Sequence, residues 1–413
     1  MTSLNEEKRK LGQVRTVRDH NRGSILRCID RQPGISRSDI SSYVGLTDAA
    51  VSRITRELID AGLISEGEEI VDKTRPGRRN VGLRVEPNGA YILSACFTLV
   101  EKRLSLINIA GDVVAHTDIS DLVELQGHDL IDELVRRVNK LLQSRRAAKG
   151  RLLGFGIAAV GSIDHELGLL REGSIDALIG LPLRPLIESK LQIPVRLENV
   201  GHTLNVSEAR NDPGIGQEDT TLLVHIALGL GSSLVIDGRP HRSAQDERMI
   251  GHIPVPGATE ECFCGARGCL NTLVSGYAIL NRLSGSIVSS RSVRSTASNY
   301  DSKSLTKAIA NANKDNRALQ ALFHEAGLAL GQNLYAVCAA VSPDRISLAG
   351  PVPQVASFAS GVMHGMSVAY GRTRARPPSL QVSHVGYVRA AELFALEEFL
   401  FNVPLRIKQM LAA

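Results

Sequence analysis

The sequence predicts an α/β protein in which an N-terminal winged helix-turn-helix, residues 10–85, precedes a larger two-lobed α/β domain, residues 86–413. Three observations support this prediction. A capped helix follows a glycine turn and precedes a basic hairpin, strands and helices alternate from residue 90 onward, and one histidine and three cysteines lie close together. At 413 residues, of which 43% are hydrophobic, the chain is long enough to bury more than one core.

Composition sets limits on the kind of protein. The net charge of +5 is mild, and basic residues exceed acidic ones only slightly within residues 1–80. Overall charge therefore does not by itself indicate nucleic-acid binding, and the placement of individual residues must support that inference. No apolar run is as long as a membrane span, and the first residues lack the character of a signal peptide. We expect a cytoplasmic protein without membrane insertion.

Two short helices joined by a glycine turn are expected first. Ser36 is the expected N-cap of a helix that ends at Val44, and Gly45 begins the turn. Thr47 then caps a second helix that ends at Gly62. One face of this second helix is apolar and comprises Val51, Ile54, Leu58 and Ile59. Its other faces comprise Ala50, Ser52, Arg53, Thr55 and Arg56.

A β-hairpin with a basic tip is expected next. Leu63–Glu66 and Val81–Val85 are the predicted strands, and Thr74–Arg79 is the turn between them. Such a tip can reach phosphates or a minor groove. The alternative is a small helical dimerisation module with a solvated basic loop. Arg53 and Arg56 are the foremost candidates for DNA contact, because the apolar stripe must face inward. The full set of candidates is Thr47, Ala49, Ala50, Ser52, Arg53, Arg56, Arg75, Arg78 and Arg79.

A candidate metal site follows from one short segment. His252, Cys262, Cys264 and Cys269 offer the thiolate and imidazole ligands that tetrahedral Zn²⁺ prefers. Gly265 and Gly268 would let the chain fold back so that the sulfurs face one point. The alternatives are a chance cluster of buried thiols or a disulfide. We favour a structural zinc, because the other cysteines are scattered along the chain.

The remaining sequence predicts two α/β halves. The expected strands are Tyr91–Leu99, Lys102–Ile109, Leu152–Val160, Thr221–Leu228 and Ser233–Ile236. A helix is expected over Leu130–Ser144, and a passage from helix to strand over Leu319–Leu348. The Ser-rich stretch Ser284–Ser304 is expected to be a mobile loop between helices.

Taken together, these motifs resemble the ROK family of repressors, open reading frames and kinases. The resemblance rests on the zinc motif, on Thr47–Ile54, which is similar to the family's recognition helix, and on Arg75–Arg79, which is similar to its arginine-rich wing. It implies an actin-like ATPase (sugar-kinase-like) fold with two lobes. It also implies a homodimer or tetramer that binds an inverted-repeat operator in double-stranded DNA.

The chain departs from the family's kinases at the residues that perform phosphorylation. Ser94–Thr98 stands where kinases place Asp-x-Gly-Gly-Thr, and Phe97 is expected to intrude where phosphate would bind. The motif Glu-Asn-Asp is here Glu198-Asn199-Val200, so the catalytic base is absent. His202 is expected to be an ordinary polar loop residue. The adenosine-binding Gly-Gly-Gly is reduced to Ala349–Pro351, and ATP binding is therefore not expected.

Two further family carboxylates of the sugar pocket are replaced by Met249 and Asn271. Each carboxylate would accept charge-assisted hydrogen bonds from a sugar, each worth about 1.5–3 kcal/mol. We expect an altered effector, such as a different polyol or a derivatised or charged sugar, although a domain that no longer senses sugar is the alternative. The residues expected to bind the effector are Glu198, Asn199, His252 and Asn271.

The sequence thus favours a DNA-binding transcriptional regulator over an enzyme. The resemblance implies a repressor of genes for carbohydrate uptake or catabolism. A sugar kinase is the least favoured alternative. In another alternative a protein partner, such as a subunit of a transport system, controls the regulator in place of a small molecule. The apolar segment Leu393–Phe401 could bind such a partner, although packing in a core or a dimer explains it more simply.

Overall fold

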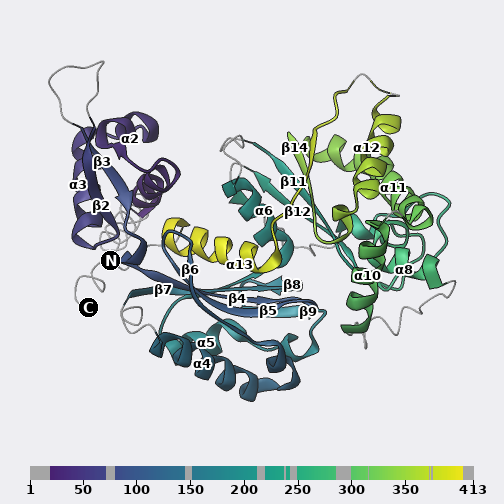
Figure 1. Cartoon of the computed structure of the whole chain (residues 1–413), viewed down its shortest axis with the longest axis horizontal. Coiled ribbons are helices and arrows are strands. Elements are labelled where there is room, and N and C mark those ends of the chain that lie inside the picture. The colour runs from purple at the N-terminus through teal and green to yellow at the C-terminus, as the bar shows by residue number, and fades with distance from the viewer. Residues whose placement is uncertain are drawn as a thin grey trace, which may run out of the picture.

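The computed structural model describes residues 19–70, 80–144, 151–211, 219–236, 239–241, 249–284, 299–314, 316–371, 373 and 375–402. Within these residues the chain forms a small N-terminal domain and two α/β lobes, and two helices lie between the lobes (Figure 1). Five short 3₁₀ helices connect larger elements in this part of the chain: Pro87–Gly89, Ser120–Glu124, Asp176–Leu178, Met249–His252 and Val352–Gln354.

The N-terminal domain has the predicted helices and hairpin. A helix over residues 19–31 precedes α2 (Arg37–Val44) and α3 (Asp48–Asp60), and strands β1 (Ile35–Ser36), β2 (Ile64–Ile70) and β3 (Asn80–Val85) form an antiparallel sheet in the order β1-β3-β2. Both predicted caps are confirmed, because Ser36 Oγ accepts from the Asp39 N–H and Thr47 Oγ1 accepts from the Ala50 N–H. Gly45 has the left-handed φ of 67° that the turn requires.

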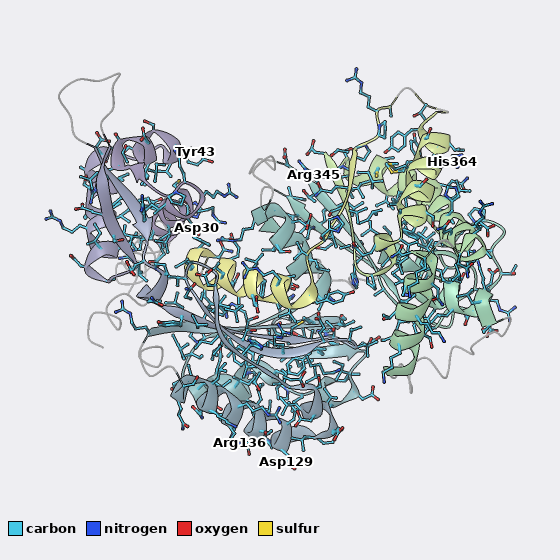
Figure 2. The ribbon with its side chains drawn as sticks, viewed as in Figure 1. Asp30, Tyr43, Asp129, Arg136, Arg345 and His364 are labelled. Carbon is cyan, nitrogen blue, oxygen red and sulfur yellow. The ribbon has the colours of Figure 1, made fainter. Side chains whose placement is uncertain are left out.

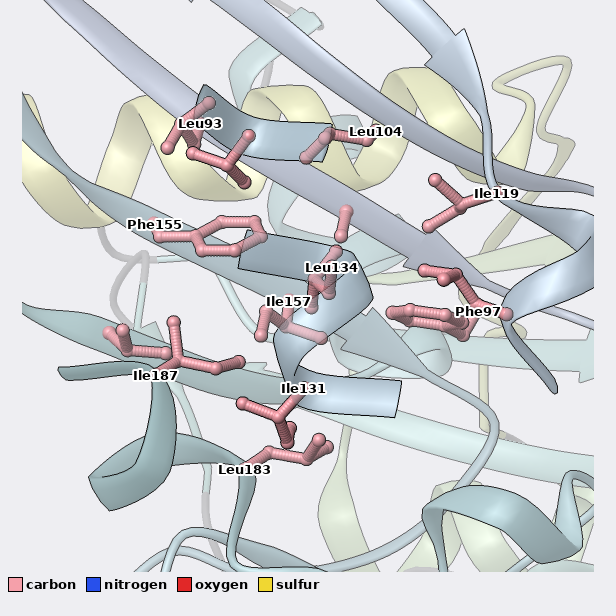
Figure 3. Packing of buried hydrophobic residues seen from close by; sticks show 14 of the residues in the cluster. Leu93, Phe97, Leu104, Ile119, Ile131, Leu134, Phe155, Ile157, Leu183 and Ile187 are labelled. Carbon is pink, nitrogen blue, oxygen red and sulfur yellow. The ribbon is translucent and has the colours of Figure 1, made fainter. Parts of the chain in front are cut away.

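Lobe 1 is a five-stranded mixed sheet in the order β10-β7-β4-β5-β6. Its strands are β4 (Tyr91–Phe97), β5 (Lys102–Asn108), β6 (Val113–Asp118), β7 (Leu152–Ala159) and β10 (Val195–Asn199), beside a small hairpin of β8 (Gly161–Asp164) and β9 (Leu169–Gly173). Helices α4 (Gly127–Gln143) and α5 (Leu183–Leu191) cover one face of this sheet (Figure 1). Figure 3 shows the resulting core, in which Phe155 and Ile157 of β7 pack with Leu134 of α4.

Lobe 2 is a second five-stranded sheet, in the order β13-β12-β11-β14-β15. Its strands are β11 (Thr221–Ile226), β12 (Leu230–Ile236), β13 (Arg239–Pro240), β14 (Arg345–Ala349) and β15 (Ser379–Val382). The helices of this lobe are α7 (Asn271–Val274), α8 (Gly276–Ser284), α10 (Asn299–Ala312), α11 (Arg317–Val341) and α12 (Ala356–Tyr370). The prediction of a loop over Ser284–Ser304 is wrong at its C-terminal end, because residues 299–304 form the start of α10. Residues 285–298 lie outside the described part of the chain.

Two helices lie between the sheets of the lobes. The first, α6 (Val200–Asn211), is bound to lobe 2, since the Asn205 side chain donates to the carbonyl oxygens of Thr221 at 3.3 Å and Ser233 at 3.0 Å. The second, α13 (Tyr387–Leu396), covers the inner face of the lobe 1 sheet and continues as a π-helix, Glu397–Asn402 (Figure 1). The lobes therefore meet where α6 packs along α13.

One hydrogen bond joins lobe 2 directly to the start of α13. His225 Nε2 of β11 and the Tyr387 hydroxyl lie 2.8 Å apart, and their rings meet edge to face. Burial lowers the pKa of His225 to about 4. The imidazole is therefore neutral in the folded protein at ordinary pH.

The N-terminal domain, lobe 1 and the C-terminal residues share one hydrophobic core. Ile25, Leu26 and Ile29 pack in a single cluster with residues of β4, β5 and α13. Leu393–Phe401 contributes to this cluster: Leu396 is fully buried, and Phe399 and Leu400 are 1% exposed. This segment is core, so the hypothesis that it forms an exposed surface for a partner is wrong. No helix in the described residues is long and apolar enough to cross a membrane.

Candidate functional site

The outer face of α3 displays most of the residues predicted to contact DNA. Thr47, Ala49, Ser52, Arg53 and Arg56 are exposed. Ala50, also predicted, is partly buried. Within the described part of the chain neither Arg53 nor Arg56 has a side-chain hydrogen bond or an ion pair, so both guanidinium groups are available to phosphates or base edges. Arg75, Arg78 and Arg79 lie outside the described residues.

The inner face of α3 contains a polar contact that the sequence did not predict. Thr55 was expected beside the exposed arginines, but it is fully buried. Its hydroxyl accepts a hydrogen bond from Arg37 Nε at 3.0 Å and donates to the Val51 carbonyl at 2.9 Å. The position of Thr55, four residues after Val51 on the apolar stripe, is the signal that would have revealed its burial.

Ion pairs fix α3 relative to the rest of the N-terminal domain. Arg37, in the first turn of α2, also donates to Glu66 of β2 at 2.7 Å. Arg22 of the first helix pairs with Glu57 of α3 at 2.7 Å. Arg37 therefore joins α2, α3 and the first strand of the hairpin, and it holds the exposed face of α3 in one orientation.

The four predicted metal ligands converge on one point. Their donor atoms all lie within 4.8 Å of one another. His252 Nδ1 lies 3.5 Å from Cys262 Sγ, and Cys264 Sγ lies 3.7 Å from Cys269 Sγ. A tetrahedral ion with bonds of about 2.3 Å to sulfur and about 2.0 Å to nitrogen separates its ligands by about 3.5–3.8 Å. The separations fit such an ion, and they are too long for a disulfide, so the alternative of a disulfide is wrong.

The backbone of the segment His252–Cys269, called the metal loop below, explains why these residues converge. The Cys262 N–H donates to the Ala266 carbonyl and the Gly265 N–H donates to the Cys262 carbonyl, which closes a tight turn. Gly268 has a φ of 72°, and a Cβ there would lie 2.4 Å from the Ala258 carbonyl oxygen. Burial and the neighbouring Cys262 sulfur raise the pKa of Cys269 to about 12. A bound cation would offset both effects and hold the sulfurs as thiolates.

Asn271, which was predicted to bind the effector, connects the metal loop to the β11–β12 hairpin. Its side-chain oxygen accepts from the Leu230 N–H at 3.1 Å, and its NH₂ group points to Cys262 Sγ at 4.0 Å. The residue is 2% exposed. Asn271 thus contacts a candidate metal ligand and holds the β11–β12 hairpin beside it.

Glu198 lies between two histidines where β10 meets α6. Its side chain is fully buried, with Oε1 3.1 Å from His202 Nδ1 and 3.7 Å from His165 Nε2. The expectation that His202 is an ordinary polar loop residue is wrong. It is 3% exposed and lies in the first turn of α6, where its imidazole contacts Glu198 at the end of β10.

The neighbouring residues of this motif are bound within the fold. Asn199 donates from Nδ2 to the Gly161 carbonyl and accepts from the Gly201 N–H at 2.6 Å. Val200 is 1% exposed and packs with Cys96 of lobe 1 and Leu223 of lobe 2. Val200, which the resemblance aligns with the base of the kinases, is therefore part of an apolar cluster between the lobes.

Phe97 does not occupy the position expected for it. The expectation was that its ring would intrude where a phosphate would approach the β4–β5 hairpin. The ring is instead fully buried in the core of lobe 1 (Figure 3). The alternating side-chain direction along β4 explains this, because Phe97 points to the same face as Leu93 and Ala95.

The four predicted effector residues come from both lobes. Glu198 and Asn199 end β10 of lobe 1, whereas His252 ends a 3₁₀ helix and Asn271 begins α7, both in lobe 2. A cavity of about 560 Å³ lies elsewhere, in the N-terminal domain, where His20, Arg27, Arg31 and Tyr43 contribute to its lining.

Comparisons with known proteins identify both parts of the chain. Residues 106–384 match the ROK family, and residues 18–65 match a winged helix-turn-helix DNA-binding family. The chain is 27% identical over 271 residues to the DNA-binding transcriptional repressor Mlc of Escherichia coli, covering 65% of this chain and 66% of Mlc. It is 24% identical over 348 residues to the DNA-binding transcriptional dual regulator NagC of the same species, covering 84% of each protein.

A solved structure has the same arrangement of elements. The crystal structure of a ROK family transcriptional regulator, described as a homolog of the E. coli Mlc protein, superimposes with a TM-score of 0.73 at 22% identity. The superposition covers 96% of this chain and 100% of that chain. The fold is therefore a winged helix-turn-helix followed by an actin-like, sugar-kinase-type domain. The chain belongs to the ROK family.

Proposed function

We propose that the protein is a DNA-binding transcriptional regulator, most simply a repressor of genes for carbohydrate uptake or catabolism. The exposed face of α3 is the observation that supports this proposal. Arg53 and Arg56 project from it without partners in the described chain, while Arg37 and Thr55 fix its inner face. The relatives Mlc and NagC are named as DNA-binding regulators, which agrees with this function.

In the proposed complex α3 enters the major groove and the hairpin after β2 contacts the backbone or the minor groove. The residues proposed to contact DNA remain Thr47, Ala49, Ala50, Ser52, Arg53, Arg56, Arg75, Arg78 and Arg79. A homodimer or tetramer would bind an inverted repeat, because two-fold symmetry in a protein calls for two half-sites. A regulator of this kind acts in the cytoplasm, on chromosomal DNA.

The larger domain is proposed to sense a sugar or sugar derivative and to have no kinase activity. Glu198, Asn199, His252 and Asn271 are the proposed effector-binding residues. Loss of catalysis is supported by Val200, since a buried valine in an apolar cluster can neither accept a proton nor position a hydroxyl group. We assign a structural Zn²⁺ to His252, Cys262, Cys264 and Cys269, where it would hold the loop against the β11–β12 hairpin.

An in vitro selection from genomic DNA tests this function. Purified, zinc-loaded protein is incubated with genomic fragments at a salt concentration that suppresses non-specific contacts. Recovery of discrete inverted repeats is the expected result, and the neighbouring genes would indicate the class of effector. Binding that is diffuse and disappears with moderate salt would contradict the proposal. Sugar-dependent ATP turnover would replace it with a kinase.

A further inference from the structure

Helix α6 connects the effector residues to the N-terminal domain. Its first turn contains His202, whose imidazole contacts Glu198, and its last turn contains Arg210. Arg210 follows Val200 by ten positions along the α-helix, a span of about 15 Å. One rigid element therefore begins at the proposed effector site and ends near the DNA-binding domain.

The middle of α6 is bound firmly to the sheet of lobe 2. Glu208, which is 8% exposed, accepts hydrogen bonds from Ser383 Oγ at 2.6 Å, Gln381 Nε2 at 3.1 Å and Ser347 Oγ at 3.3 Å. Together with the contacts of Asn205, these bonds hold the helix to strands β11, β12, β14 and β15. When lobe 2 moves, α6 must move with it.

The N-terminal domain is bound to the other lobe. Its first helix shares a hydrophobic core with α13 and lobe 1. Arg151, at the start of β7, donates to the carbonyl oxygens of Ala61 and Gly89, both at 2.5 Å. A Cβ on Gly23 would lie 2.0 Å from the Phe401 carbonyl oxygen, so the first helix touches the backbone of the C-terminal π-helix. The winged helix therefore moves with lobe 1 and α13.

At Arg210 the end of α6 meets the N-terminal domain. Its guanidinium donates to Asp30 of the first helix at 2.7 Å and to Glu397 of the π-helix at 3.4 Å, and it lies 5.3 Å from the centre of the Phe401 ring. The side chains of Arg210 and Asp30 are only 16% and 14% exposed. Figure 2 shows Asp30 on the side of the N-terminal domain that faces the end of α13.

We propose that α6 couples the effector site to the DNA-binding domain, and that the Arg210–Asp30 ion pair is the contact through which lobe 2 acts on the winged helix. This inference rests on the proposed function of the protein as an effector-controlled regulator. A change in the angle between the lobes slides α6 along α13. The Arg210–Asp30 contact must then break or pull on the first helix, because the two residues belong to different bodies.

Hydrogen exchange of the full-length protein tests the coupling without DNA and without a known effector. Glu198→Gln keeps the size of the side chain but changes its contact with His202 at the start of α6. In the wild-type background we expect exchange in the helix over residues 19–31 to change by about threefold or more, the scale of measured couplings along packed networks. In an Arg210→Gln background we expect this response to disappear.

Arg196→Gln is the matched control. Arg196 pairs with Glu398 of the same π-helix at 3.2 Å, but its strand β10 belongs to lobe 1, so this pair does not bridge the two bodies. The response to Glu198→Gln should therefore persist in the Arg196→Gln background. His202→Gln, which changes the same contact from the α6 side, provides a second perturbation if Glu198→Gln fails to fold.

Two results would overturn the coupling. One is an unchanged exchange rate in the first helix for every perturbation at Glu198 and His202. The other is a response that persists at full size when Arg210 is replaced. A failed search for an operator would instead contradict the proposed function, and it would leave the exchange result unaffected. With an operator in hand, Arg210→Gln should keep operator affinity within about threefold, because Arg210 is not on α3, yet abolish the change in affinity caused by Glu198→Gln.

Discussion

Replacing Thr55 with valine should loosen α3 although no predicted DNA contact is altered. Valine keeps the shape of the buried side chain but removes the hydroxyl that accepts from Arg37 Nε at 3.0 Å. Hydrogen bonds to charged groups contribute about 1.5–3 kcal/mol, and water can partly replace this one because the Arg37 side chain is 28% exposed. We therefore expect a loss of about 1–2 kcal/mol in the local opening free energy of α3.

Hydrogen exchange across α3 measures this quantity directly. A loss of about 1–2 kcal/mol accelerates exchange by about 5–30-fold where opening is local. Thr55→Ser is the matched comparison, because serine keeps the hydroxyl and loses one buried methyl group. In an Arg37→Ala background the effect of Thr55→Val should shrink to the part due to the lost bond with the Val51 carbonyl, whereas the effect of Thr55→Ser should be unchanged.

Equal effects of Thr55→Val in both backgrounds would refute the reasoning, because the hydrogen bond to Arg37 would then contribute nothing. If the reasoning holds, Thr55→Val should also weaken operator binding, since α3 must be ordered before it can bind. The loss of affinity should not exceed the loss of local stability.

Four other changes have defined outcomes. Arg53→Ala should lower operator affinity by about 1–3 kcal/mol and leave the oligomer intact, as measured by titration and sizing. Cys269→Ser should reduce bound zinc from one ion per chain and speed exchange in residues 249–275 before it unfolds the domain. Val200→Asp should give no sugar phosphorylation and should lower the thermal midpoint, because it buries a carboxyl in an apolar cluster. His225 has a lowered pKa, so its contribution is present above pH 6.5 and is lost as the pH falls toward about 4. His225→Gln should flatten the pH dependence of stability in that window by at most about 3 kcal/mol.

Controls separate these effects from general damage. Ser52→Ala, beside Arg53 on the exposed face, should change operator affinity much less than Arg53→Ala. Cys338→Ser replaces a buried thiol outside the metal loop and should leave zinc content unchanged. Unaltered affinity of Arg53→Ala would remove this residue from the DNA interface, and full zinc content in Cys269→Ser would remove that ligand. Phosphorylation by Val200→Asp would show that a nucleotide site persists, and an unchanged pH profile in His225→Gln would assign the titration to another group.

Local sequence was sufficient for the elements of the N-terminal domain. Ser36 and Thr47 cap the helices as predicted, and Gly45 adopts the left-handed turn, because capping and turn geometry depend on a few neighbouring residues. The cluster of side chains able to hold a metal was also predictable, since Cys262, Cys264 and Cys269 lie in one short loop. Thr55 and His202 were misjudged, because their burial depends on elements distant in sequence that cover them.

The sequence by itself determined the order of elements and the residues able to bind metal, and its resemblance to the family predicts that the kinase base is absent at Val200. Only the tertiary structure showed that Leu393–Phe401 closes the core of the N-terminal domain and that Arg210 meets Asp30, 180 positions earlier. The physical reason is the distance in sequence between the residues that interact. Caps, turns and metal loops are formed by neighbours along the chain, whereas a shared core and a buried ion pair depend on how separate lobes pack, which no local pattern encodes.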